Sequence, residues 1–443
     1  MNSPALSPAV ARFEENTADF SPEASGLQNT RALQALLDRG GRILINRPGV
    51  YRVAGTAYIG SDTELIFAPG VVLRKTDEAG PFSHVLLNRG ARDRRTDRRI
   101  RVEGLHLEVN GVDKRVYEVF GLHGQLAFFH VEDVRIERFR CHDLGAWQYA
   151  IQVCSFENLL VNDVVIHGRK DGVHLGRGRR FRISNGVFRT YDDAVALNAH
   201  DYSTGNPELG WIEDGIVENC HDLEAPDTTG FFCRILAGAW TDWLPGMKVR
   251  QSDTVVSGGR LYRVQMQPDG REHVSTTRPT HTSGRAELDG ITWGVVQEGE
   301  VRTAGVRNVT FRDIFLRKNR TAFSIHFDND IYSRSFYPGA EIPEQGGLLF
   351  DGIRVLHDGG QPLLSIDTPV DLVALRDCFL RDNPVVFRDT GAELAHPATR
   401  FDVSGCVFPR ADQTLRIENG LPNKQILLNG QPHPASSGIA PAR

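Results

Sequence analysis

The chain has 443 residues, of which 40% are hydrophobic, so it is long enough to bury a large core. Its 56 acidic residues outnumber its 51 basic residues, which gives a formal net charge of −5. Domains that bind nucleic acid usually present a basic face, so this balance argues against a nucleic-acid partner. No stretch approaches the roughly 18 consecutive apolar residues that cross a membrane, so we expect no membrane partner.

The first residues, MNSPALSPAVARFEENTADF, have neither the basic start nor the apolar run of a secretory signal peptide. We therefore expect a soluble, cytoplasmic protein, although a chain whose signal peptide had been removed would be secreted and would give the same pattern. The six cysteines form no Cys-x-x-Cys pair, so we expect buried free thiols and no metal site built on cysteine.

The segment 1–99 predicts a helical cap followed by the first strands. In LQNTRALQALLDRGG, Leu33, Leu36 and Leu37 fall on one face of a helix, and the glycine pair at 40–41 marks its end. The apolar residues of RILINRPGVYRVAGTAYIGSDTELIFAPGVVLRK then alternate between Pro-Gly and Gly-Ser turns, as strands do.

A repeat of short strands follows, over 100–239 and again over 300–443. The runs AIQV, GVHL and AVAL begin at residues 150, 172 and 194, which is a period of 22 residues. A fixed period in this range, built from strands and turns, indicates a solenoid whose coils stack on their neighbours. The consensus of leucine-rich repeats is absent. The sequence therefore predicts an all-β fold, a parallel β-helix.

A companion strand repeats beside the first one. NLLVNDVVIHG, RRFRISNGVFR, GWIEDGIVENC and RNVTFRDIFLR each alternate apolar and polar residues around a central Asp or Asn. Side chains of this type serve turns and stacked ladders. The turns between coils vary in length, and long turns are where such a fold usually carries its function.

The segment 240–299 interrupts the repeat with a stretch rich in Gly, Ser and Thr, which predicts a small inserted β module. Its aromatic residues are Trp240, Trp243, Tyr262 and Trp293. Two interpretations stay open: the aromatic side chains form the core of the module, or they form a platform that stacks on sugars.

Three carboxylates are brought together by the repeat. Asp171 and Asp193 lie 22 residues apart, so they would stack on adjacent coils about 4.8 Å apart, with Asp192 beside them. Close acids raise one another's pKa, which lets one hold a proton while another stays ionised, and glycoside hydrolysis needs that division. The alternative is that each Asp only serves a turn.

The Asp-Gly pair followed 21 residues later by Asp-Asp resembles the active-site signature of polygalacturonase-like glycoside hydrolases. These enzymes belong to the pectate-lyase-like superfamily of right-handed parallel β-helices, and NTRALQALL with GGRILINRPGVYRV resembles the cap of that superfamily. The resemblance implies that one member of the Asp pair is the general acid and that the other acids activate water. We assign Asp192 as the acid and Asp171 and Asp193 to the water, with Asp192 and Asp193 interchangeable.

The chain differs from the family at the positions where the family binds its substrate. The family's Asn-Thr before the first Asp is replaced by Arg169-Lys170, and Thr229-Gly230 is the nearest counterpart of its His-Gly. The Arg-Ile-Lys that holds a uronate is replaced by SIHF at 324–327. We therefore expect the substrate to be a neutral or differently charged glycan, not pectate.

Other polar residues align with the acids when the repeats are superposed. Gln152, His174, Ala196, Arg234 and Ser324 fall into one outward-facing column. In the loop 198–211, which leaves the Asp-Asp strand, His200, Asp201 and Tyr202 could close a subsite, and the alternative is a plain surface turn. The expected substrate-binding residues are Lys170, His174, Asn198, His200, Arg234, His326 and Asp328.

Three functions follow from these residues. The first is a glycoside hydrolase that inverts the anomeric configuration, has a carbohydrate substrate and needs no cofactor or metal. The second is a polysaccharide lyase with calcium on the Asp cluster and Lys170 or Arg234 as base. The third is a β-helix that binds glycans without cleaving them. The oligomeric state is left open as monomer or homo-oligomer.

Overall fold

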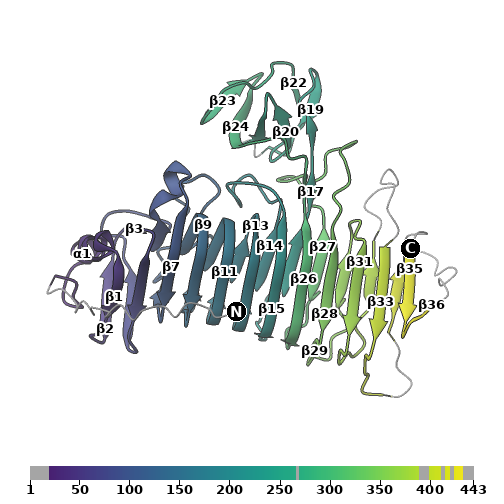
Figure 1. Cartoon of the computed structure of the whole chain (residues 1–443), viewed down its shortest axis with the longest axis horizontal. Helices are drawn as coiled ribbons and strands as arrows, with labels where there is room; N and C mark the ends of the chain where they lie inside the picture. Colours follow the sequence, from purple (N-terminus) through teal and green to yellow (C-terminus); the bar gives the residue numbers. More distant parts are fainter. Residues whose placement is uncertain (1–18, 266–268, 389–398, 411–414, 420–423, 433–443) are drawn as a thin grey trace, which may run out of the picture.

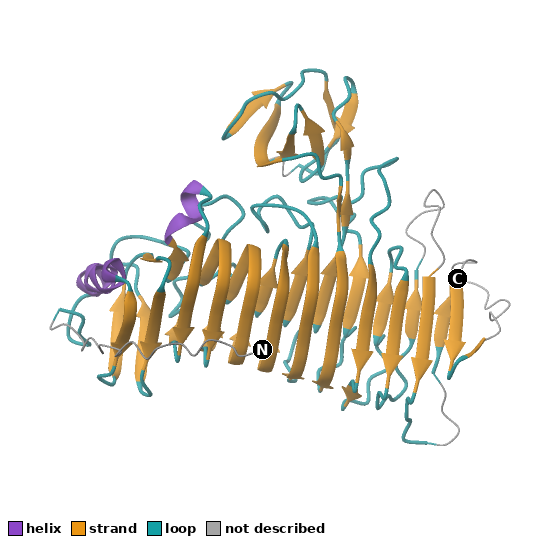
Figure 2. Cartoon of the chain, in the orientation of Figure 1, coloured by secondary structure: helices purple, strands orange, loops and turns teal. Residues whose placement is uncertain are grey.

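The computed structural model describes residues 19–265, 269–388, 399–410, 415–419 and 424–432. These residues build an elongated stack of parallel strands, with an α-helix at its N-terminal end and a short 3-10 helix, η1 (Arg89–Asp93), further along (Figures 1 and 2). The predicted parallel β-helix is confirmed. Within the described part of the chain, no helix has both the length and the hydrophobicity needed to span a bilayer.

Helix α1 (Gly26–Arg39) covers the open N-terminal end of the stack. Its first turn is held by a capping box, in which the backbone N–H of Gln28 donates to Ser25 Oγ and the side chain of Gln28 accepts from Ser25 N–H. The predicted face of Leu33, Leu36 and Leu37 is buried. The helix thus shields the apolar interior that the first coil would otherwise expose.

One long sheet of the stack carries the candidate site, and we call it the site sheet. Its strands pair in register one coil apart: Ile151 with Val173, Val173 with Val195, and Val195 with Cys233. The 22-residue period is therefore the length of the coils that carry the acids, and the coil between Val195 and Cys233 is longer because it includes the loop 199–211. The site sheet contains β3 (Ala57–Ile59), β6 (Leu86–Asn88), the first parts of β9 (Leu126–Glu137) and β11 (Ile151–Gly168), β12 (Val173–Leu175), β14 (Val195–Asn198), β16 (Cys233–Leu236), β27 (Phe323–His326) and β30 (Leu364–Ile366).

Single left-handed residues form the corners of the companion strands. Asn158 and Asp214 have φ values of 60° and 57°, and Asn308 on a later coil has 57°. Asn and Asp tolerate this region better than most residues. The central Asp or Asn of the repeats also lies in this region, since Asp163, Asn185 and Asp313 have φ values of 54°, 56° and 50°. The ladder is partly hydrogen-bonded, since Asn308 Nδ2 donates to Asp214 Oδ1 at 3.2 Å. These strands are the rest of β11, β13 (Gly178–Thr190), β15 (Ile212–Asp222), β26 (Val306–Leu316) and β28 (Gly346–Asp351).

The interior of the stack is filled by columns of apolar side chains in register. Val161, Ile183, Val217, Phe311 and Phe350 occupy equivalent positions on successive coils, and all are buried. The rings of Phe311 and Phe350 stack with centroids 5.0 Å apart. Each coil therefore buries its apolar face against the next coil and contacts little beyond it.

The segment 240–299 leaves the stack after β17 (Gly238–Ala239) and returns at β25 (Thr303–Ala304), and it projects from the long side of the solenoid (Figure 1). Trp243, Tyr262 and Trp293 are buried in a core of its own. These aromatic rings are therefore not available as a sugar platform. The module contains β18 (Thr241–Asp242), β19 (Met247–Val249), β20 (Thr254–Ser257), β21 (Arg260–Val264), β22 (His273–Ser275), β23 (Arg285–Leu288) and β24 (Ile291–Glu298).

Trp240, the fourth aromatic residue, belongs to the solenoid instead. It is buried in the main core, and its indole Nε1 donates to the carbonyl of Val301 at 2.7 Å. The cysteines agree with the expectation of free thiols, since all six are unbonded and only Cys406 is partly exposed.

Candidate active site

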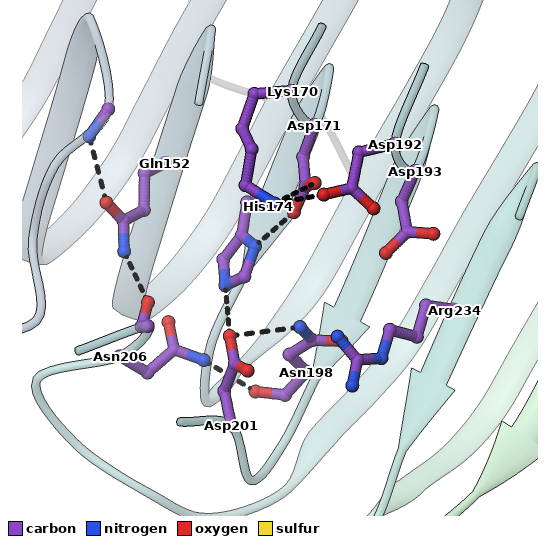
Figure 3. Close-up of polar contacts among 12 residues, drawn as sticks. Gln152, Lys170, Asp171, His174, Asp192, Asp193, Asn198, Asp201, Asn206 and Arg234 are labelled. Carbon is purple, nitrogen blue, oxygen red and sulfur yellow. Dashed lines mark hydrogen bonds and ion pairs between the residues drawn. The ribbon is translucent and has the colours of Figure 1, made fainter. Parts of the chain in front are cut away.

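The three predicted acids meet at the start of two neighbouring strands of the site sheet. Asp171 precedes β12, and Asp192 and Asp193 precede β14. The backbone N–H of Gly172 donates to the carbonyl of Asp193 at 2.9 Å, which fixes the two coils in register. One carboxylate oxygen from each acid lies within 4.8 Å of the others (Figure 3). The solenoid pitch thus brings together acids that are a full coil apart in sequence.

Asp171 is the acid held in the ionised state. It is buried, and burial alone raises the pKa of its carboxyl. Lys170, with Nζ 3.7 Å from Oδ1, and His174, with Nδ1 2.8 Å from Oδ2, outweigh burial and bring the pKa below its usual value. Asp171 can therefore accept a proton at neutral pH.

The pKa values of Asp192 and Asp193 are shifted in the opposite direction, above the usual value. Burial and the charge of Asp171 raise the pKa of Asp192, although Lys170 forms an ion pair with its Oδ2. Burial and the charge of Asp192 raise the pKa of Asp193 well above its usual value, although Phe231 N–H donates to its Oδ1 at 2.7 Å. The two adjacent carboxyls therefore hold a proton more readily than Asp171 does. Asp192 is the more accessible of the two, with 24% of its side chain exposed.

His174 is fully buried and lies between the carboxylates of Asp171 and Asp201. Its Nδ1 contacts Asp171, and its Nε2 lies 3.3 Å from Oδ2 of Asp201. Burial lowers the pKa of the imidazole, but the hydrogen bonds to both carboxylates raise it to about 9. Its ring stacks on Tyr149 with centroids 4.0 Å apart. The outward column does contain His174, but the ring orients Asp171 and is not exposed for substrate contact.

Asp201 is tied into this arrangement from the loop 199–211. Its Oδ2 also accepts from Asn198 Nδ2 at 3.1 Å, and its Oδ1 accepts from Tyr202 N–H at 2.7 Å. Although burial opposes ionisation, the hydrogen bond from His174 helps bring the pKa of Asp201 far below its usual value. Asn198, expected to bind substrate, therefore supports Asp201.

A second polar group lies on the next coils. Arg234 forms an ion pair with Oδ1 of Asp328, and His326 Nε2 lies 3.5 Å from the same oxygen. The predicted column is confirmed here, since Arg234 pairs in register with Ala196 and with Ser324. The side chains of Arg234 and His326 are 15% and 16% exposed, so both reach the surface near the acids.

His200 does not lie where a subsite would be expected. Its side chain is buried against Trp240, with ring centroids 5.9 Å apart. Burial and Arg263 lower the pKa of its imidazole well below the usual value. Packing of the loop against the base of the module therefore directs this ring away from solvent.

Two further residues lie beside the acids, and only Asp201 was considered from the sequence, as one of the loop residues that could close a subsite. Tyr149 lies 22 residues before Asp171, so the same period contained the signal for it. Lys170 Nζ lies over its ring at 5.7 Å. The period gave no position for Asp201, because this residue lies in a loop outside the repeat.

The carboxylate cluster does not fit a calcium site. Its three acids offer oxygens at suitable separations, but the ammonium group of Lys170 already contacts Asp171 and Asp192. Although burial opposes the charge on Lys170, Asp171 and Asp192 raise its pKa above the usual value. A permanent cation of the protein thus stands where a bound cation would be needed.

The fold defines the class, which is the right-handed parallel β-helix. Among solved structures, the family 28 exopolygalacturonase of Yersinia enterocolitica is similar with a TM-score of 0.51 and 14% identity, over 96% of this chain and 79% of that one. The endo-xylogalacturonan hydrolase of Aspergillus tubingensis gives a TM-score of 0.40 and 10% identity, over 97% and 98% of the two chains. The Streptococcus pneumoniae adhesin PfbA gives 0.46 and 12%, over 90% and 96%.

At identity this low, the similarity shows a shared fold and says nothing about activity, because one fold hosts many functions. No protein-family model matches the sequence, and no curated protein matches it.

Proposed function

We propose that this protein hydrolyses glycosidic bonds with Asp171, Asp192 and Asp193. The observation that carries the proposal is the split ionisation of three neighbouring carboxyls: the pKa of Asp171 is lowered, whereas those of Asp192 and Asp193 are raised. Hydrolysis of a glycosidic bond needs one carboxylic acid and one carboxylate at the same bond. A protein that only binds glycans, such as an adhesin, does not need one ionised carboxyl beside another that holds a proton.

In this mechanism Asp192 donates a proton to the leaving oxygen. It is the more accessible of the two carboxyls whose pKa is raised, since Asp193 is only 1% exposed. Asp171, ionised and oriented by His174, takes a proton from water as the bond breaks. Asp193, whose pKa is also raised, helps to position the water.

The stereochemical outcome remains a prediction. Inverting enzymes usually separate their two carboxyls by roughly 6.5–9.5 Å to leave room for water. The nearest oxygens of the three acids lie within 4.8 Å, which is closer than that spacing. The expected inversion therefore rests on the resemblance of the motif, and the configuration of the first product decides it.

A neutral or weakly charged glycan fits the surroundings of the acids best. The cations that reach solvent there already have ionised partners, Lys170 with Asp171 and Arg234 with Asp328. A uronate would have to compete with these ion pairs for its recognition. Lys170, with its raised pKa, is also a poor base for the elimination that a lyase performs.

The test is a panel of polysaccharides with product NMR, run on the wild type and on Asp192→Asn. We expect hydrolysis of at least one glycan, lowered about 10²–10⁴-fold by the substitution. Asp214→Asn, the same change at an exposed corner, is the matched control and should keep full activity.

Other outcomes separate the alternatives. An unsaturated product that absorbs ultraviolet light would identify a lyase instead. Binding of a glycan with no cleavage, unchanged in Asp192→Asn, would identify a glycan-binding protein and overturn the proposal.

A further inference from the structure

A groove that the proposed hydrolysis does not use lies at the other end of the site-sheet strands from the acids. The acids precede β12 and β14, whereas the groove is lined where the chain leaves the site sheet, at 130–132, 155–157 and 177–179. Its volume is about 500 Å³, which falls within the range of roughly 300–1,000 Å³ that is usual for ligand pockets. The groove is therefore a separate cavity that can hold a ligand of its own.

A row of charged side chains on successive coils lines the groove. β7 (Asp97–Glu103) pairs with β9 so that Arg98 lies opposite Glu132, and β11 pairs with β13 so that Glu157 lies opposite Arg179. Arg98 Nε donates to Glu132 Oε2 at 2.6 Å, and Arg179 Nη2 donates to Glu157 Oε2 at 2.8 Å. The row thus presents N–H donors and carboxylate acceptors whose charges already have partners.

The row gives the groove its length. Arg98 and Glu213 stand at its two ends, and the register between paired strands connects them in four steps from coil to coil. At about 4.8 Å for each step, the row is about 19 Å long. A ligand that follows it is elongated and lies along the axis of the solenoid.

Glu208 fixes the positions of further donors in the groove. Its side chain is 4% exposed, and its oxygens accept from His130 Nε2 at 3.0 Å, Arg94 Nη1 at 3.2 Å, Ser155 Oγ and Arg177 Nη1 at 3.4 Å. Although burial raises the pKa of Glu208, the hydrogen bond and charge of His130 help bring it below the usual value. The side chains of Arg94 and Arg177 are 41% and 40% exposed, so their guanidinium groups are held in place and still reach solvent.

Apolar side chains complete the lining. They include Phe156, Trp211 and Val301, and Val301 is 41% exposed. The guanidinium of Arg307 lies 4.6 Å from the ring centroid of Trp211 and helps to hold the indole in place. A sugar ring has apolar C–H faces beside its hydroxyl groups, and aromatic side chains pack on such faces.

From this combination we infer that the groove is a second, non-catalytic binding site for an uncharged oligosaccharide segment. Its fixed donors and acceptors suit hydroxyl groups, and little ordering is needed when the ligand binds. Each cation of the lining, Arg98, His130, Arg177 or Arg179, already contacts a carboxylate, so an anionic ligand would have to displace that partner. The inference rests on the proposed function for the identity of the glycan, which is the polymer that the acids cleave.

The first experiment measures binding without cleavage, by affinity electrophoresis of Asp192→Asn on arabinan, xyloglucan, mixed-linkage β-glucan, polygalacturonate and carrageenan. We expect retardation by at least one of the neutral polymers, with the same dissociation constant at about 0.1 M and about 1 M salt. Binding only to the two polyanions, lost at high salt, would overturn the assignment to an uncharged glycan. Binding to none of the polymers would overturn the site.

The second experiment places the binding in the groove. Trp211→Ala and Arg177→Ala, each added to Asp192→Asn, should weaken it by about ten-fold or more. Arg177→Ala removes a side chain that is 40% exposed, so it tests the groove without removing a core residue. Arg312→Ala is the matched control, since Arg312 is a 46% exposed arginine that contacts Glu218 and Asp351 outside the groove. Unchanged binding in both groove variants would overturn the inference.

Kinetics of the groove variants in the otherwise wild-type chain separate this inference from the hydrolase function. We expect Arg177→Ala to raise KM for the polymer, with kcat unchanged and with both constants unchanged for a trisaccharide. An equal loss on polymer and trisaccharide would show that the groove is not separate from the acids. Binding in the groove with no cleavage of any glycan would overturn the hydrolase function and leave the groove as a binding site.

Discussion

The charge of His174 depends on its two carboxylate partners, so its contribution to stability depends on pH. The pKa is about 9 in the folded protein and about 6.5 when the imidazole is unperturbed. A raised pKa stabilises the fold fully below about 6.5, and this stabilisation is lost as the pH rises through about 9.

We therefore expect His174→Gln to lower the free energy of unfolding by about 3–5 kcal/mol at pH 5.5 and by clearly less at pH 10. Urea denaturation at both values measures the difference. His142→Gln, on an exposed histidine, provides the reference. An equal loss at both pH values would show that the imidazole is not charged in the fold.

Lys170 sets the ionisation of the acids it contacts. Its ammonium is the largest influence that lowers the pKa of Asp171, and it also opposes the raised pKa of Asp192. In Lys170→Met both carboxyls should protonate more easily. The acidic limb of the pH–rate profile should then move upward by about one to three pH units.

The same variant distinguishes two roles of the lysine. If Lys170 tunes the acids, Lys170→Met keeps activity at higher pH. If Lys170 is itself a base that removes a proton from the sugar, activity is lost at every pH. Lys248→Met, on an exposed lysine of the module, should leave the profile unchanged.

Much of the site followed from the 22-residue period, and the rest depended on loops. The period places Asp171 beside Asp193 and would have placed Tyr149 as well. The position of Asp201 could not be obtained in this way, because it depends on how the loop 199–211 packs against the module. The burial of His174 has the same origin: alternation shows which side chains point outward, but not which ones a loop then covers.

At the scale of elements, the inserted module has a small core separate from that of the solenoid. Trp293 is fully buried among its apolar residues. Trp293→Ala should cost about 3–5 kcal/mol, which is a large share of what a core of this size can provide. We expect proteolytic cleavage within 240–299 while the circular dichroism of the solenoid is retained.

The comparison variant for the module is Val274→Ala, which removes an apolar side chain that is 51% exposed. It should resist proteolysis as the wild type does. Loss of the solenoid signal in Trp293→Ala would show that the module and the coils unfold together.

At the scale of the whole molecule, stability should be distributed coil by coil. Interior residues such as Ile183 contact their equivalents on the two neighbouring coils. Because the contacts are between neighbours, damage to one coil weakens the coils beside it first. Ile183→Ala should cost about 2–5 kcal/mol and deprotect the coils that carry the acids.

Hydrogen exchange followed by mass spectrometry locates the damage. Phe387→Ala, in β32 (Val385–Phe387) near the C-terminal end, should deprotect only the last coils and leave activity unchanged. Uniform deprotection of the whole chain by either variant would contradict the nearest-neighbour description.

The left-handed corners, finally, determine where this chain can change in length. Each corner is formed by one left-handed residue, such as Asn158 or Asp214. One extra residue there would move the inward-facing side chains of the following strand to the outer face of the coil. The segments that follow β14, β16 and β27 are long loops and have no such restriction. They leave adjacent parallel strands, so they lie together at the C-terminal edge of the site sheet, whereas the acids precede β12 and β14 at the other end of these strands. Insertions and grafts are thus expected at this edge, where the chain can change in length without disturbing the stacked interior.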